Sequence, residues 1–172
     1  MLPRSVPATL RFLDEPPSEL RALTPAAAGQ IIVAIEGEAG ALPAPLRTTL
    51  SLALTTTGLR RVSVLAATVN ITPRAFSRVC TRAHLPAPKH WLLLAHAIQV
   101  SAALNRNPAA PFSNLAEVLG YPDEFSLSRA LFSTLGCRLR TIRRNPRISF
   151  VIARWLLRHA VAVARRPERQ PA

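Results

Sequence analysis

The chain has 172 residues, a formal net charge of +13 and 49% hydrophobic residues, and arginine supplies nearly all of the positive charge. This length predicts one domain with at most an appendage, and the hydrophobic content excludes a chain that is mostly disordered. Two cysteines exclude a disulfide scaffold, and no stretch of 18 residues is both apolar and uncharged enough for a membrane-spanning helix. The first residues also lack the apolar run of a secretory signal, so a cytoplasmic location is predicted.

The charge is distributed unevenly along the chain. Residues 1–59 contain four arginines and five acidic residues, a net charge of −1. Residues 60–172 contain 18 basic and four acidic residues, a net charge of +14. A charge this far from zero predicts an anionic partner, and we expect the C-terminal two thirds to contact it.

The N-terminal third is interrupted by seven prolines, which predict the absence of long helices and strands. Residues 30–36 predict either a short strand or the end of a helix that starts at Pro25. The apolar spacing of residues 45–56 predicts a helix with Pro45 as its first residue. No role is predicted for residues 1–44.

An internal repeat begins near residue 59. Residues 63–66 match residues 113–116 at an offset of 50. Farther on, residues 76–78 match residues 127–129 at an offset of 51. Matched landmarks in two units of about 20 residues predict two copies of one supersecondary structure.

The first unit is predicted to form a helix, a tight turn and a second helix. Ser63 can cap the first helix, and Asn70 tolerates the left-handed conformation that the turn requires. Thr72 can then cap the second helix, residues 73–83, which has a proline at its first position.

The second unit has the same predicted layout. Ser113 can cap its first helix, and Gly120 can form the turn. Asp123 can cap the second helix, residues 124–135, and Gly136 can end it.

Between the units, residues 88–104 are apolar on most faces, which predicts a buried helix about 25 Å long. A helix of this length could hold two recognition helices about one turn of DNA apart, roughly 34 Å.

After the second unit, residues 148–164 predict an amphipathic helix with one basic and one apolar face. The basic stripe consists of Arg147, Arg154, Arg158 and Arg165, and the apolar face of Ile148, Val151, Ile152, Trp155, Leu156 and Ala162.

The segments LAATVNITPRAFSRV (65–79) and NLAEVLGYPDEFSLSRALFSTLG (114–136) carry a family resemblance. Residues 59–144 resemble the C-terminal DNA-binding domain of AraC-type (AraC/XylS) transcriptional regulators. The resemblance implies an all-α fold, with two homeodomain-like helix-turn-helix subdomains joined by a long linker helix. The predicted divisions are an N-terminal appendage (1–44), the double helix-turn-helix domain (45–144) and a basic helix with its tail (145–172).

The resemblance further implies a bacterial transcriptional regulator whose partner is double-stranded DNA, with both recognition helices in successive major grooves. Arginine can pair with guanine, glutamate can accept from cytosine, and serine can serve either base. The implied base-contacting residues are Arg74, Ser77, Arg78, Glu124, Phe125, Ser128 and Arg129. The predicted phosphate-contacting residues are Thr72, Arg82, Arg140, Arg143 and Arg144.

The sequence departs from the family pattern at several positions. Asn70 replaces the usual glycine, and Leu139 and Ile142-Arg143 replace a proline and an aromatic–arginine pair. Phe125 replaces a small polar residue, and its ring could contact a thymine methyl group or rotate inward. Residues 1–44 are too short for the usual sensor domain, so no small-molecule effector is predicted.

Other interpretations of these residues remain open. Arg129 could pair with Glu117 instead of reading a base. Cys80 and His84 share a helix face, but a buried cysteine is predicted in preference to a metal ligand. No catalytic arrangement or phosphate-binding loop is present in the sequence, which predicts a protein without catalysis, metal or cofactor.

Two alternative functions are retained. The first is a basic amphipathic protein of a membrane surface or scaffold, based on the helix at 148–164. The second is non-specific coating of nucleic acid. The same helix could instead pack on the domain or form a dimer interface. Under the main hypothesis no membrane partner is predicted, and residues 1–44 or 148–164 could contact RNA polymerase or another protein.

Overall fold

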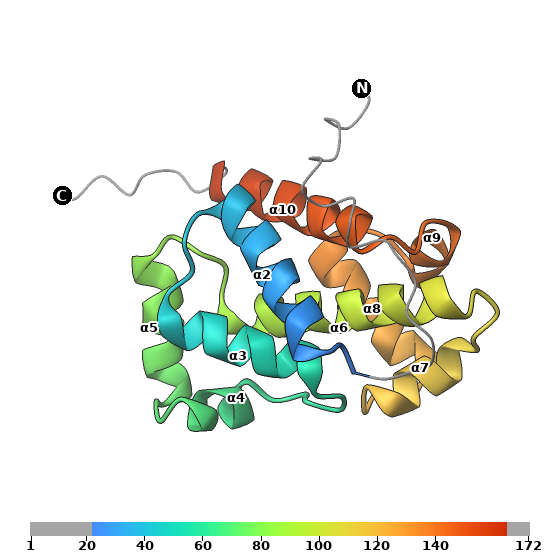
Figure 1. Cartoon of the computed structure of the whole chain (residues 1–172), viewed down its shortest axis with the longest axis horizontal. Helices are drawn as coiled ribbons and strands as arrows, with labels where there is room; N and C mark the ends of the chain where they lie inside the picture. Colours follow the sequence, from blue (N-terminus) through green and yellow to red (C-terminus); the bar gives the residue numbers. More distant parts are fainter. Residues whose placement is uncertain (1–21, 165–172) are drawn as a thin grey trace.

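The computed structural model describes residues 22–164, with side chains as far as residue 159, and all secondary structure in this part is helical. The prediction of an all-α fold is therefore confirmed (Figure 1). The helices in chain order are α2 (Pro25–Ala39), α3 (Ala44–Thr55), α4 (Val62–Thr68), α5 (Pro73–Arg82), α6 (Pro88–Arg106), α7 (Phe112–Val118), α8 (Glu124–Leu135), α9 (Leu139–Arg144) and α10 (Ile148–Ala164).

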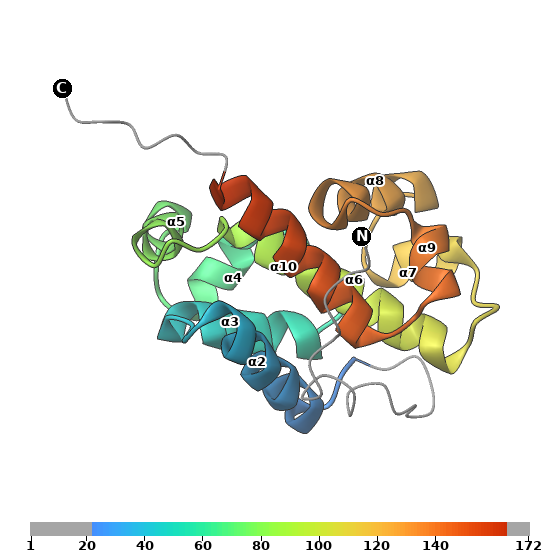
Figure 2. The same ribbon diagram turned by 90° about the horizontal axis from the view of Figure 1, so that it is seen from above.

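Helix α6 is the centre of the fold, and it confirms the prediction of a buried helix between the two repeat units. Every residue from Trp91 to Leu104 is buried. Helices α3, α8, α9 and α10 all pack against it. Figures 1 and 2 show the pair α4–α5 near the start of α6 and α7 near its other end, with α10 crossing α6.

The N-terminal third forms a longer element than its prolines predicted. Helix α2 has 15 residues, and Pro25 stands at its first position while the Thr24 side chain accepts from the Ala27 amide. Proline is compatible with the first helical turn because its missing N–H has no partner there in any case. The prediction that long elements are absent was wrong, as was the strand alternative for residues 30–36, whereas the helix starting at Pro25 is confirmed.

Side-chain caps also stabilise the starts of α5 and α8. Thr72 accepts from the Ala75 amide at 3.1 Å, and Asp123 accepts from the Ser126 amide at 2.6 Å, as predicted. Asn70 has a φ of 54° and Gly136 a φ of 65°, so both adopt the predicted left-handed conformation.

The predicted caps Ser63 and Ser113 were wrong. Helix α4 begins at Val62 after Arg61, and α7 begins at Phe112 after Pro111. In each case the carbonyl of this earlier residue accepts the first helical hydrogen bond, from the amide of Leu65 or of Leu115. The two serines therefore lie inside the first helical turn with exposed side chains.

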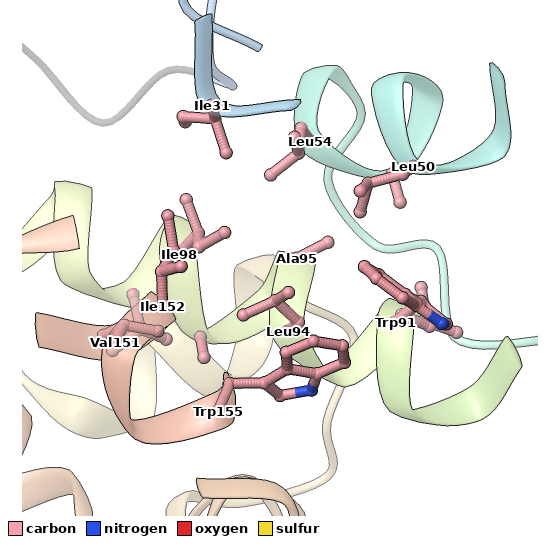
Figure 3. Packing of buried hydrophobic residues seen from close by; sticks show 14 of the residues in the cluster. Ile31, Leu50, Leu54, Trp91, Leu94, Ala95, Ile98, Val151, Ile152 and Trp155 are labelled. Atoms are coloured by element: carbon pink, nitrogen blue, oxygen red, sulfur yellow. The ribbon is translucent and has the colours of Figure 1, made fainter. Parts of the chain in front are cut away.

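Helix α10 has the predicted bounds, and its apolar face packs into the core. Val151, Ile152 and Trp155 are buried. The centroids of the Trp155 and Trp91 rings are 4.5 Å apart (Figure 3). One hydrophobic cluster extends from Leu23 to Trp155, so the packing crosses the limits predicted at residues 44 and 144. The side chains of Ala162 and Arg165, assigned to the two faces of this helix, lie outside the described residues.

Candidate nucleic-acid interface

Helix α5 has one buried and one strongly basic face. Phe76 and Cys80 are buried in the core. The residues predicted to contact bases on this helix are all exposed, and Ser77 Oγ donates to the Pro73 carbonyl at 3.0 Å. The outward face carries Arg74, Ser77, Arg78 and Arg82. Within the part of the chain that the structure describes, none of these arginines forms an ion pair.

Helix α8 presents a different set of outward residues. Leu127, Leu131 and Leu135 face the core, while Arg129 and Phe125 point to solvent. Phe125 is 72% exposed, so the alternative in which its ring rotates inward is wrong. Glu124 and Ser128 are half-buried.

The proposed pairing of Arg129 with Glu117 does not form among the described residues. Arg129 instead lies near Asp123, the N-cap of its own helix. Hydrogen bonds from Ser126 lower the pKa of the Asp123 carboxyl, and the charge of Arg129 adds to this effect. Arg129 and Arg78 are both exposed to solvent.

Four of the five residues predicted to contact phosphate are exposed: Thr72, Arg82, Arg140 and Arg144. Arg143 is placed differently. Its guanidinium stacks on the Phe112 ring at 3.7 Å and donates to the Ala110 carbonyl. These contacts hold Arg143 against the loop before α7, so its guanidinium is already engaged inside the molecule.

The buried His96 joins the two repeat units, a role that sequence reasoning missed. Its Nε2 lies 2.7 Å from the Leu59 carbonyl, and its Nδ1 lies 2.8 Å from the Tyr121 hydroxyl. A carbonyl can only accept, so Nε2–H donates to Leu59, and Nδ1 accepts from Tyr121. His96 thus connects the segment before α4 to the turn between α7 and α8. The available signal was a histidine within the mostly apolar stretch 91–104, where Gln99 and Ser101 are the other polar residues.

The turn of the second unit is also packed closely against Arg60. Gly120 has a φ of 76°, and a Cβ atom at this position would lie 2.9 Å from Arg60 Cδ. The Arg60 guanidinium lies 4.8 Å from the centre of the Tyr121 ring. The positive φ of this turn favours glycine, and the Arg60 side chain would have to shift to make room for a Cβ atom. Together with His96, these contacts set the position of one unit relative to the other.

The basic stripe of α10 is partly used inside the molecule. Arg154 donates to the Gly136 carbonyl at 3.3 Å, and Arg158 donates to the Ser133 carbonyl at 3.1 Å. Both carbonyls lie at the C-terminal end of α8, where the helix dipole favours positive charge. These two arginines therefore anchor α10 to α8.

Cys80 behaves as a small apolar residue, as predicted. It is a free, buried cysteine, and burial raises the pKa of its thiol to about 11. Among the described residues, no three histidine, cysteine or acidic side chains lie close enough together to hold a metal ion.

We expect acid to weaken the connection at His96. Burial lowers the pKa of His96 from 6.5 to about 4. The folded state disfavours the charged form, so this contribution to stability is complete above pH 6.5 and is lost as the pH falls toward 4. The expected loss by pH 5 is about 2 kcal/mol in the free energy of unfolding.

Urea unfolding at pH 7 and pH 5 measures this effect, with His96→Gln as the comparison. The variant is less stable at pH 7, and its difference from the wild type should narrow by about 2 kcal/mol at pH 5. Both proteins contain His159, whose pKa is also lowered to about 4. Its contribution therefore cancels in the difference between their free energies of unfolding. A difference that does not change with pH would contradict the prediction.

Comparison of the chain with models of known protein families, with curated proteins and with solved structures gave no match. In the described range, no helix combines the length and apolar character needed to cross a membrane.

Proposed function

We propose that this protein is a sequence-specific DNA-binding protein of the AraC type that regulates transcription in the bacterial cytoplasm. In this proposal α4–α5 and α7–α8 are the two helix-turn-helix units, and α5 and α8 enter successive major grooves of double-stranded DNA. The observation that carries the proposal is the outward face of α5. Arg74, Ser77 and Arg78 are exposed there, and no described carboxylate pairs with the arginines.

The chemistry of this face suits the major groove. Arg74 and Arg78 are four residues apart and so share one side of the helix. Each guanidinium can donate two hydrogen bonds to O6 and N7 of a guanine, and Ser77 can serve a neighbouring base. The amides at the start of α5 and the exposed Arg82 are suited to phosphate oxygens.

The arrangement of the two units is consistent with two adjacent DNA sites. Helix α6 has 19 residues, a length of about 28 Å, and the units are attached toward its two ends. Successive major grooves on one face of DNA are about 34 Å apart. The contacts of His96 with Leu59 and Tyr121 would keep this spacing constant.

The membrane-surface alternative has less support. It needs the apolar face of α10 to be free, but Val151, Ile152 and Trp155 are buried in the core. It also needs the basic stripe, of which Arg154 and Arg158 already donate to carbonyls of the α8 end.

Selection of DNA from a random pool with the purified protein tests the proposal. We expect enrichment of two short sequence boxes about one helical turn apart. Binding to the selected DNA should weaken steeply with salt, with a slope of about −0.9 in log–log form for each phosphate neutralised. Binding without any enriched sequence would favour the coating alternative, and no binding at all would refute both.

A further inference from the structure

Phe125 is the most exposed of the large hydrophobic side chains in the described residues, at 72%. It is the second residue of α8, and Asp123 caps the helix just before it. A phenylalanine held out from the first turn of a helix gains nothing from burial in the core. Its position leaves the ring open to an external contact.

The internal repeat shows what Phe125 replaces. At the offset of 51 that relates the two second helices, Phe125 corresponds to Arg74. Both residues stand two positions after the N-cap, Asp123 in α8 and Thr72 in α5, and both are exposed. The same place on the two helices thus carries a cation in one unit and an aromatic ring in the other.

The rest of each helix extends this contrast. Helix α5 contains three arginines and no acidic residue, whereas α8 contains one glutamate and one arginine. Two helical turns beyond Phe125, Phe132 is also 50% exposed. Helix α8 therefore offers little net charge to phosphates and a large apolar surface.

We propose that α8 reads thymine, with the Phe125 ring packed on the C5-methyl group of one thymine in the second DNA box. This inference rests on the proposed function and specifies the base that this unit recognises. The thymine methyl is the one apolar group that standard base pairs present in the major groove. Arg129, one turn farther along α8, remains free to contact a neighbouring base or phosphate.

Replacing thymine by deoxyuridine tests the contact, because it removes this methyl group and leaves the base-pairing atoms unchanged. Each thymine of the selected second box is replaced in turn, and affinity is measured for the wild type and for Phe125→Ala. We expect one position at which deoxyuridine weakens wild-type binding about fourfold, the effect of one lost buried methyl group. Phe125→Ala should bind the two DNAs equally.

Two further variants serve as controls. Phe132→Ala removes the other exposed ring of α8 and should keep the preference for thymine. Phe125→Leu keeps an apolar side chain and should therefore keep part of the preference for thymine over deoxyuridine. Because Phe125 is exposed, its substitution should leave the helical circular dichroism unchanged, and this is measured for each variant.

The possible failures are distinguishable. Specific binding in which deoxyuridine is neutral at every position would overturn this inference and leave the proposed function intact. Failure to select any specific DNA would refute the proposed function itself. If Phe125→Ala binds DNA as the wild type does but lowers the oligomeric mass in sedimentation, the ring is a protein contact and the inference is wrong.

Discussion

Replacement of Trp155 by alanine is expected to lower the free energy of unfolding by about 3–5 kcal/mol, the usual cost of deleting a large buried aromatic side chain. Trp155 is 1% exposed, and its ring lies 4.5 Å from the ring of Trp91. Its indole N–H also donates to the His90 carbonyl at 3.3 Å. Thermal unfolding measures the effect, which corresponds to a decrease in Tm of about 10 °C.

The control for Trp155→Ala is Leu157→Ala in the same helix. Leu157 is 55% exposed, so its truncation should change stability by less than about 0.5 kcal/mol. If the two variants were equally stable, α10 would not belong to the cooperative core. The comparison therefore tests whether the C-terminal helix is part of the fold or an appendage.

Replacement of Arg78 by alanine is expected to weaken binding to selected DNA by about 1–3 kcal/mol, or roughly 5- to 150-fold, if this side chain pairs with guanine. The variant should also accept other bases at the position that Arg78 reads. Arg78 is exposed and belongs to a helix with no acidic residue, so its loss should leave the fold intact. Titration of the selected DNA and of single-base variants by fluorescence anisotropy measures both effects.

Arg47→Ala is the matched control, because it removes the same charge from α3. Arg47 pairs with Glu36 at 3.3 Å and is exposed. A general effect of net charge would weaken DNA binding equally in both variants, and that result would refute base reading by Arg78.

A phosphate contact such as the one proposed for Arg140 should give a different result. Its loss reduces the slope of log affinity against log salt by about one unit and weakens binding to all sequences alike.

Features that depend on neighbours within a few residues were predicted well. Thr72 and Asp123 cap their helices through amides only three residues away. Asn70 and Gly136 adopt left-handed conformations that few other residues tolerate. These choices are made within one helical turn, so the order of residues is enough to infer them.

The errors arose where one residue type can serve two structures. Proline interrupts a helix when it lies in the interior, but it is favourable in the first turn. Pro25 is the first residue of α2 and so begins this helix. No further proline occurs before Pro43, which leaves room for α2 and was the overlooked signal. Ser63 and Ser113 are good caps, but Arg61 and Pro111 already adopt the extended conformation that starts each helix.

The sequence by itself determined the all-α class, the two repeat units, the buried helix between them and the basic character of the C-terminal two thirds. Only the tertiary structure decided how the arginines are used. Arg143 and Arg144 are adjacent, yet Arg143 stacks on Phe112 while Arg144 remains exposed. The reason is physical, because hydrophobic period and capping act along the chain, whereas the ring or carbonyl that engages a guanidinium can come from residues far away in sequence.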